Sequence, residues 1–469
     1  MSLKISYKLS ANVLSTIVPP IPLANAWAES YKPTPLRPLI DMSQGAPGTP
    51  PPKLLRDALA DVVRRDGVNG GGWGYCPWNG EKEMREGIAR EVRTIYRGRG
   101  QEGVEVDVNE DDVAITSGCN LAFVAVVMSV AGAGDEVILP VPWYFNHQMD
   151  LTLLGITPVS LYTFPSEGFL PSVSRCEKRI TSKTRAIALV SPNNPTGATY
   201  PPSLIASFLQ LARKHNVALI LDETYRDFIT SPDPPHSLFS QHPSQPSWRE
   251  NLIHLFSFSK SYLIPGHRLG LIIASPTLLT QLRTILDSLQ ICPARPMQLA
   301  LAPLLPSLRP MIVEEALKIE KRHRLFKERL PKGWEVGSAG GYFAFVRHPW
   351  GGKGAFGPSG KDEELCQRMA SDLGVVALPA SFFSPKEEEE EGSCARLGGW
   401  QPEDWMRFSV ANVDDEKIVE LITVQLYIFA KAVRDLYQTV AHHGDGYIKI
   451  GIPERSHDQA FSRNPSPYI

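Results

Sequence analysis

The sequence predicts an α/β protein in which a large domain, built on a mostly parallel sheet sandwiched by helices, precedes a smaller α+β domain. Short apolar, β-rich runs alternate with amphipathic helical segments through the middle of the chain. Such alternation is typical of a parallel sheet with helices on both faces. After about Pro310 the pattern changes to a charged helical stretch followed by isolated strands, which indicates a second domain of different architecture.

Six runs of the large domain have the length and composition of buried strands. They are Val113–Thr116, Glu136–Pro140, Arg185–Ser191, Val217–Asp222, Leu252–Ser257 and Leu269–Ala274. Between two of them, Pro201–His215 is expected to be a helix, because it is amphipathic and opens with two prolines. Ligands bind at the carboxyl ends of the strands in such a sheet, and the motifs described below fall at those ends.

The smaller domain is expected to contain helices at Val313–Glu328 and Asp362–Leu373 and strands at Gly340–Val346 and Val375–Leu378, with a loop rich in Gly and Lys up to Lys361. We divide the chain into an N-terminal arm and loop at 1–48, a large domain at 49–308, a small domain at 309–440 and a tail at 441–469. The tail loses all periodicity and is expected to be disordered. The run Glu387–Glu391 is expected to be a solvated loop insertion, with an acidic docking site as the alternative.

Composition excludes several classes of protein. The chain has 469 residues and a formal net charge of −2, so it has no overall attraction to nucleic acid or to an anionic membrane. No apolar run reaches the roughly 18–20 residues that a membrane span needs. The first 28 residues are expected to form an arm and not a cleavable signal, because Pro19, Pro20 and Pro22 interrupt their apolar stretch.

The six cysteines give no sign of a metal site. None forms a CxxC pair, and none stands at zinc-finger spacing from a histidine. Well-spread thiols in a long chain predict reduced cysteines in a cytoplasmic protein.

The strongest chemical signal is Ser257-Phe258-Ser259-Lys260, followed eight residues later by Arg268. A lysine directly after an apolar strand carries a charge whose burial is costly, and a role as amine nucleophile for a carbonyl cofactor would explain its position. Ser257 and Arg268 would then serve a phosphate dianion, the arginine through two parallel hydrogen bonds. Taken alone, Lys260 is more readily explained as a surface lysine after a strand end.

A second signal, Leu221-Asp222-Glu223-Thr224-Tyr225, ends a predicted strand. A carboxylate at the mouth of a buried strand can pair with a protonated pyridine nitrogen and keep that ring an electron sink. Tyr225, three residues later, can reach the phenolic oxygen of the same ring. The structural alternative is that Asp222 caps the following helix.

Two turns complete the set. In Ser191-Pro192-Asn193-Asn194-Pro195-Thr196-Gly197, Asn194 could donate to the same phenolic oxygen, although Asn, Pro and Gly form tight turns without any such role. In Ile115-Thr116-Ser117-Gly118-Cys119-Asn120, a strand leads through small residues into a helix whose first amides could hold a phosphate. Many α/β proteins contain such a turn.

Taken together, these motifs resemble the class I/II aminotransferase family of pyridoxal-phosphate-dependent enzymes of fold type I, in order and spacing from about Ser43 to Asn412. The resemblance implies an enzyme that moves an amino group between an L-amino acid and a 2-oxo acid. It implies that pyridoxal 5'-phosphate binds covalently to the amine of Lys260, which is also the catalytic base. The other cofactor residues would be Asp222, Tyr225, Asn194, Ser257, Arg268, Gly118, Cys119 and Asn120.

The same resemblance assigns two tyrosines. Tyr144 would stack on the cofactor ring, with Trp143 as the competing choice, and Thr224 would touch the opposite face of the ring. Tyr75 resembles the tyrosine that reaches the phosphate in the neighbouring subunit, which implies a homodimer with shared active sites. A structural tyrosine in a turn is the alternative for Tyr75.

The resemblance also assigns substrate contacts. Gly45 lies in a segment similar to the loop beside the substrate carboxylate, and Arg407 resembles the arginine that binds this carboxylate together with Asn194. A planar, permanently charged guanidinium suits a carboxylate, and the alternative for Arg407 is a surface salt bridge. Ala380 departs from the family, in which glycine is frequent at this position.

Two other functions and the choice of substrate stay open. A lyase of the same fold, such as a carbon–sulfur lyase or an enzyme resembling aminocyclopropane-carboxylate synthase, would share the cofactor residues. A non-catalytic regulator would carry a winged-helix domain ahead of the fold, and the ~40 residues before Ser43 are too few for one. Arg295 is a candidate second cation for a dicarboxylate, although an interface or surface role is expected for it. Four aromatic residues would suit either bulky apolar substrates or dimer packing: Trp73, Trp78, Trp143 and Phe145.

Overall fold

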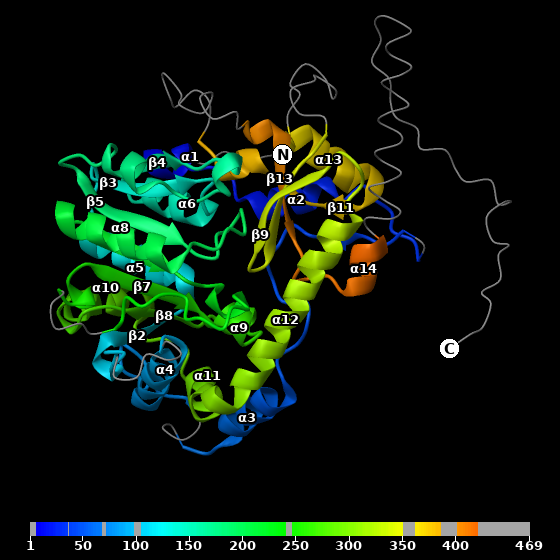
Figure 1. Ribbon diagram of the computed structural model, residues 1–469. Coiled ribbons are helices and arrows are strands. Elements are labelled where there is room, and N and C mark those ends of the chain that lie inside the picture. Colours follow the sequence, from blue (N-terminus) through cyan, green and yellow to red (C-terminus); the bar gives the residue numbers. More distant parts are fainter. Residues whose placement is uncertain are drawn as a thin grey trace, which may run out of the picture.

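The computed structural model describes residues 6–35, 37–67, 72–97, 105–240, 246–349, 362–385 and 401–420. The glutamate run Glu387–Glu391, the tail at 441–469 and most of the loop predicted before Lys361 lie outside the described residues. Figure 1 shows a large domain built around one sheet, a smaller domain beside it, and helix α12 running from one to the other.

The sheet of the large domain has the strand order β2-β8-β7-β6-β5-β3-β4. Its strands are β2 (Val113–Thr116), β3 (Glu136–Val141), β4 (Thr157–Tyr162), β5 (Thr184–Val190), β6 (Ala218–Asp222), β7 (Leu252–Ser257) and β8 (Gly270–Ile273). Strand β8 runs antiparallel to both its neighbours, β2 and β7, and the other pairs are parallel. The predicted mostly parallel sheet is therefore confirmed.

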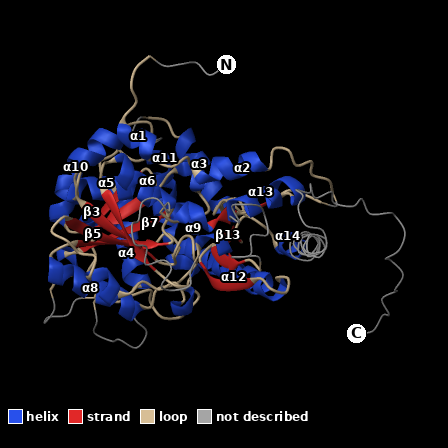
Figure 2. Cartoon of the chain, turned by 90° about the horizontal axis from the view of Figure 1, so that it is seen from above, coloured by secondary structure: helices blue, strands red, loops and turns tan. Residues whose placement is uncertain are grey.

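Helices cover both faces of this sheet, as Figure 2 shows. The helices of the large domain are α3 (Lys53–Arg64), α4 (Lys82–Ile95), α5 (Cys119–Val130), α6 (Phe145–Leu153), α7 (Val173–Glu177), α8 (Pro202–His215), α9 (Phe258–Ser261), α10 (Pro276–Gln290) and α11 (Arg295–Leu301). The arm before them contributes α1 (Ala11–Ser15) and α2 (Pro20–Trp27). Among the described residues, no helix combines the length and apolar character needed to cross a membrane.

Helix α8 illustrates how local sequence sets these elements. Pro202 occupies its first turn, where a missing N–H costs nothing. Three basic residues, Arg213, Lys214 and His215, fill its last turn, where cations interact favourably with the helix dipole. Asn216 then ends the helix in the left-handed region with φ 53°, a conformation that asparagine adopts more readily than most residues.

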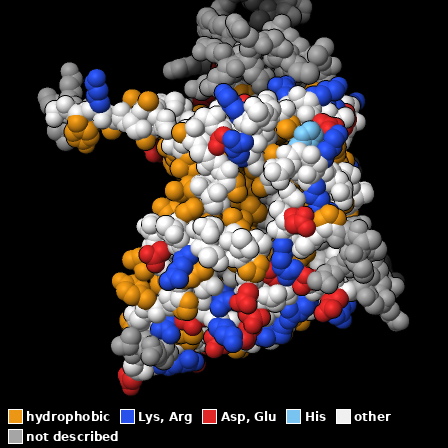
Figure 3. All heavy atoms as spheres, turned by 90° about the vertical axis from the view of Figure 1, so that its left-hand side faces the viewer, with side chains coloured by type: hydrophobic (Ala, Val, Ile, Leu, Met, Phe, Trp, Pro, Cys, Tyr) orange, Lys and Arg blue, Asp and Glu red, His pale blue; other side chains and the backbone are white. Residues whose placement is uncertain are grey.

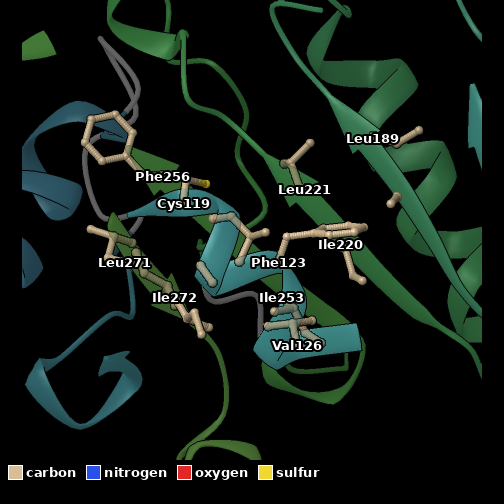
Figure 4. Close-up of a cluster of buried hydrophobic side chains, with 14 of the residues drawn as sticks. Cys119, Phe123, Val126, Leu189, Ile220, Leu221, Ile253, Phe256, Leu271 and Ile272 are labelled. Carbon is tan, nitrogen blue, oxygen red and sulfur yellow. The ribbon is translucent and has the colours of Figure 1, made fainter. Parts of the chain in front are cut away.

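One part of the core of the large domain lies between α5 and the sheet. In Figure 4, Phe123 and Val126 of α5 lie against strand side chains that include Ile220, Ile253 and Ile272. All five are at most 4% exposed. Strands covered on both faces read as continuous apolar runs, which is why the sequence pattern located them.

The small domain contains an antiparallel sheet in the order β12-β13-β10-β9. Its elements are α12 (Leu305–Arg329), β9 (Glu335–Gly340), β10 (Phe343–Arg347), α13 (Asp362–Leu373), β12 (Leu378–Pro379), β13 (Trp405–Ser409) and α14 (Asp415–Glu420). A separate parallel pair, β1 (Ile40–Asp41) with β11 (Val375–Val376), ties the segment before Ser43 to this domain.

The small domain differs in detail from the predicted elements. The predicted strand Gly340–Val346 is confirmed from Phe343 onward as β10, but its predicted start is wrong, because Gly341 turns the chain with φ 52° between β9 and β10. The predicted strand Val375–Leu378 divides between β11 and β12, which belong to different sheets. Helix α12 begins at Leu305, so the proposed boundary at 308/309 falls inside a continuous helix. Strand β4 was not predicted.

Candidate active site

The directions of the strands bring the sequence motifs together at one edge of the large sheet. Parallel strands place Asn194 after β5, Asp222 at the end of β6 and Lys260 after β7 along the same edge. Because β8 runs the opposite way, Arg268 precedes this strand and still reaches that edge, where Gly270 pairs with Ser257. A pocket of about 260 Å³ opens there.

Lys260 reaches into this pocket from the short helix α9. Its Nζ donates a hydrogen bond of 2.5 Å to the carbonyl oxygen of Gly45. Burial, together with the positive charges of Arg268 and Arg407, lowers the pKa of Lys260 to about 8. About one tenth of this amine is therefore uncharged at pH 7, far more than for an ordinary lysine, and a nucleophile or a base requires this form.

Asp222 is buried and held from two sides. Its Oδ1 accepts hydrogen bonds from the hydroxyl of Thr224 at 2.7 Å and from the amide of Thr224 at 3.0 Å. Its Oδ2 lies 3.4 Å from Nε2 of His147. Burial raises the pKa of Asp222, but the interactions with His147 and Thr224 outweigh burial and leave that pKa below its usual value. The carboxylate therefore stays ionised, as a partner for a protonated ring nitrogen must.

The other end of the pocket offers donors to an anion. Helix α5 begins after Gly118 without any side-chain cap, so its first amides are free to bind an anion. A Cβ atom at Gly118 would lie 2.3 Å from a guanidinium nitrogen of Arg268, and the φ of Gly118 is 93°. Only glycine allows Arg268 to approach this helix end so closely. The hydroxyl of Ser257 accepts from the amide of Ser259 and keeps its own proton to donate.

Arg407 lies in the pocket wall on β13, from the small domain. Its Nη1 donates to Oδ1 of Asn194 at 2.8 Å, and its Nη2 donates to the carbonyl oxygen of Ser43. Its Nε is buried and makes no hydrogen bond with any described residue. Burial lowers the pKa of Arg407 to about 10. This value is still well above 7, so the guanidinium remains charged at neutral pH. A buried, charged and incompletely paired arginine suits a carboxylate ligand.

Most of the predicted site residues line this one pocket. They are Lys260, Asp222, Tyr225, Asn194, Tyr144, Ser257, Arg268, Cys119, Asn120, Gly45 and Arg407. Gly118 borders it through Arg268. Tyr144 donates to Oδ1 of Asn120 at 3.4 Å and therefore lies close to the start of α5.

Two predicted aromatic residues lie elsewhere. Tyr75 is 79% exposed and does not line the pocket of its own chain. Trp143, the competing choice for ring stacking, is buried and is not among the lining residues. Arg295 is also absent from the lining, because its Nε pairs with Oε1 of Glu81 at 2.5 Å.

Sequence reasoning missed His147, although it lies against Asp222. The imidazole stacks on Phe123 with ring centroids 3.8 Å apart. The only available signal was a position three residues after Tyr144 on a short helix, and a lone histidine there is usually a packing residue. It also missed Ile21, Gln44, Asn146 and Phe343, which come from the arm, the loop before α3, α6 and β10.

Comparison with known proteins identifies similar chains. The sequence model of the family described as aminotransferase class I and II matches residues 37–424. Aspartate aminotransferase of Thermotoga maritima is 26% identical over 350 residues, which are 74% of this chain and 84% of that protein. The aromatic aminotransferase ISS1 of Arabidopsis thaliana is 26% identical over 378 residues, which are 76% of this chain and 88% of that protein.

Solved structures show the same fold. Aspartate aminotransferase of Thermus thermophilus, solved with maleate, superposes with a TM-score of 0.73 at 21% identity, over 90% of this chain and 99% of that chain. YbdL of Escherichia coli, described as having a methionine aminotransferase function, gives a TM-score of 0.74 at 22% identity, over 90% of this chain and 100% of that chain.

Proposed function

The chain belongs to the class I and II aminotransferases, enzymes that move an amino group between an amino acid and a 2-oxo acid, and we propose that it does so with pyridoxal 5'-phosphate bound to Lys260. One observation carries the proposal for the cofactor. The amine of Lys260, the carboxylate of Asp222 and the guanidinium of Arg268 face a single pocket. The amine can react with an aldehyde, the carboxylate can pair with a protonated pyridine nitrogen, and the guanidinium can bind a phosphate.

The donor set fits this cofactor in its details. The amides at the start of α5, the hydroxyl of Ser257 and Arg268 make a phosphate site in which the glycine at 118 leaves room for the guanidinium. Asn194 uses its carbonyl oxygen for Arg407, so its amide group is free to donate to a phenolic oxygen. Tyr225 also faces the pocket and can donate to the same oxygen.

Each residue then has a defined task. Pyridoxal phosphate, when bound, supplies an electron sink that weakens the bonds at the amino acid's Cα. Asp222 keeps a proton on the ring nitrogen, since its own pKa is lowered. Arg407 binds the substrate carboxylate and fixes the orientation of the substrate. Lys260, whose pKa is about 8, would take the proton from the substrate Cα and deliver it to the carbon of the cofactor's aldehyde group.

Replacement of Lys260 tests this proposal. Lys260→Ala should bind the cofactor without the visible absorbance of the lysine-bound form and should transfer no amino group. A wild-type protein that forms glutamate from 2-oxoglutarate and an amino donor supports the transferase, whereas release of ammonia or a thiol without glutamate supports a lyase. Retained transfer by Lys260→Ala would overturn the role of this lysine.

The proposal includes a homodimer with shared active sites. Tyr75 is 79% exposed and Trp73 is 66% exposed, although side chains of this size are usually buried or in an interface. One face of the molecule also carries hydrophobic side chains gathered in a central hollow (Figure 3). Tyr75 would reach the phosphate site of the second subunit. A dimeric mass in solution, and weaker cofactor binding by Tyr75→Ala, are the expected results.

The cytoplasm is the proposed compartment. Each of the five described cysteines is unpaired, and Cys76, Cys119, Cys176 and Cys366 are buried. Free thiols in this number are typical of a reducing compartment. Fluorescence microscopy of a tagged full-length chain tests this location, and the expected result is signal in the cytoplasm.

A further inference from the structure

The turn after β6, which carries Asp222 and Tyr225, also carries three other charged residues. Glu223, Arg226 and Asp227 belong to it, and together with Asp222 they are each at most 6% exposed. Burial of a charge is costly unless the charge is paired. This short segment therefore depends on partners from the elements packed around it.

Two of these charges pair with elements of the large domain. Oε2 of Glu223 lies 2.9 Å from Nε2 of His254, which is on β7. Nη1 of Arg226 donates a hydrogen bond of 3.3 Å to the hydroxyl of Tyr96, the residue directly after α4. These contacts fix the turn against the sheet and against α4.

Asp227 pairs instead with α12, the helix that runs on into the small domain (Figure 1). Its Oδ1 accepts a hydrogen bond of 2.6 Å from Nη2 of Arg309, and its side chain is only 1% exposed. Burial raises the pKa of Asp227, but the positive charges of Arg309 and Arg226 outweigh burial and lower that pKa. Asp227 therefore stays ionised, and the ion pair persists through the neutral range of pH.

This ion pair is close to Tyr225 in the chain but does not face the same cavity. Tyr225 immediately precedes the 3-10 turn Arg226–Phe228, and its carbonyl oxygen accepts from the amide of Phe228 at 3.0 Å. Tyr225 lines the active-site pocket, whereas Asp227 and Arg309 border a separate cavity of about 420 Å³. The pair can act on a bound cofactor only through the turn, by fixing where the hydroxyl of Tyr225 lies.

A buried ion pair contributes little to stability, because the lost hydration of the two charges offsets most of their attraction. An apolar pair of similar volume would fold about as well, but it would hold the turn with less directional precision. We propose that Asp227 and Arg309 are positioning residues for amino transfer, and that their ion pair holds Tyr225 at hydrogen-bonding distance from the phenolic oxygen of the cofactor. The inference rests on the proposed function, which places that oxygen beside Tyr225.

The visible absorbance of the cofactor-loaded protein, titrated with pH, reports this hydrogen bond. While the nitrogen that joins Lys260 to the cofactor is protonated, the phenolic oxygen shares that proton. Once the proton is lost, the oxygen carries more negative charge and the hydrogen bond from Tyr225 strengthens. The bond therefore favours the deprotonated form and lowers the midpoint of the titration. A displaced Tyr225 should raise this midpoint, and Tyr225→Phe gives the full effect.

The double variant Asp227→Leu, Arg309→Met tests the proposal. Its midpoint should rise by about half a pH unit or more, in the same direction as that of Tyr225→Phe, and its melting temperature should not fall. In the Tyr225→Phe background the same two changes should cause no further rise, because they act through this tyrosine. Arg309→Lys, which keeps a positive charge beside Asp227, should restore the wild-type midpoint.

Asp112 and Arg249 provide a matched control. Oδ2 of Asp112 lies 2.7 Å from Nη2 of Arg249, and their side chains are 0% and 20% exposed, against 1% and 27% for Asp227 and Arg309. Asp112 precedes β2, at the end of the sheet away from the pocket. Asp112→Leu with Arg249→Met should leave the midpoint unchanged.

The outcomes separate the inference from the proposed function. An unmoved midpoint in the Asp227→Leu, Arg309→Met variant would overturn the inference, and a lower melting temperature with that result would assign the pair to stability alone. A further rise in the Tyr225→Phe background would also overturn it. Should the double variant not fold, Asp227→Asn, which keeps the volume of the side chain, must move the midpoint in the same direction. A wild-type protein that gains no visible absorbance from pyridoxal phosphate would instead overturn the proposed function, and the inference with it.

Discussion

Nε2 of His147 lies 3.4 Å from Oδ2 of Asp222, on the carboxylate oxygen that Thr224 leaves free. The two oxygens of Asp222 are therefore held by different elements, α6 on one side and the turn after β6 on the other. This arrangement makes His147 a positioning residue for the carboxylate, since it acts on the cofactor only through Asp222.

His147→Phe is expected to change the pH dependence of transfer. The phenyl ring keeps the stacking on Phe123 but removes the interaction that lowers the pKa of Asp222. That pKa should rise, so the acid limb of kcat/KM should move to higher pH. A pH profile of kcat/KM measures this shift. Phe123→Leu, which disturbs only the stacking, is the control, and a profile unmoved in His147→Phe would contradict the role.

Uptake of cofactor by the cofactor-free protein should depend on pH through Lys260. Only the uncharged amine attacks an aldehyde, and the lowered pKa of about 8 makes that form abundant at a lower pH than for an ordinary lysine. The uptake rate should rise by about tenfold per unit below pH 8 and level off above it. Nα-acetyllysine in the same buffers should keep rising beyond pH 9. An uptake rate that keeps rising beyond pH 9, as it does for Nα-acetyllysine, would show that Lys260 has an ordinary pKa.

Gly118→Ala is expected to weaken cofactor binding. The new Cβ would lie 2.3 Å from Arg268, so this guanidinium must leave the end of α5. We expect the Kd for the cofactor to rise by at least about tenfold, measured by equilibrium dialysis. Gly134→Ala isolates the backbone strain, because Gly134 has a similar φ of 89° with no atom within 4 Å of an added Cβ. Equal losses in both variants would mean that strain, and not Arg268, is responsible.

Asp150→Asn is expected to stabilise the protein above neutral pH. The carboxyl group lies on α6, and its Oδ2 is buried without a hydrogen bond to any described residue. Burial raises the pKa of Asp150 to about 7. Because the folded pKa exceeds the unfolded one, ionisation destabilises the folded state progressively as pH rises from about 4 through 7.

The gain from Asp150→Asn should therefore be present at pH 8 and absent at pH 4. We expect about 2 kcal/mol at pH 8, roughly half of what the full shift would give, since the folded state relaxes around a charge. Urea unfolding at both pH values measures it. Asp61→Asn, whose side chain is 68% exposed, should show no such dependence. A gain that is equal at both pH values would contradict the mechanism.

The sequence predicted strands in which every residue is buried. It did not predict contacts between residues that are far apart in the chain. Strand β7 was predicted at its observed bounds because every residue from Leu252 to Ser257 is buried. Strand β4 was missed, since its first half is partly exposed and carries Pro158. Asn194, Asp222 and Lys260 were found because each stands at or just after the end of such a strand, whereas Gly45, Tyr75 and Arg407 were assigned only by the family resemblance.

Other parts of the site could not be read from the chain. Ile21 lies in the arm, far from every motif, and only the folding of α2 against the small domain brings it to the pocket. His147 is distinguished from a packing histidine only by its distance from Asp222. Both depend on contacts between separate elements, for which a single sequence carries no periodic signal.

The hydrogen bond from Arg407 to the carbonyl oxygen of Ser43 joins positions 364 residues apart. A ribosome must therefore release nearly all of the described chain before this bond can form. During synthesis, the nascent large domain can fold while its ligand-binding cleft still lacks one wall. A ligand that needs Arg407 for its binding can therefore stabilise the chain only after both of these segments have been synthesised.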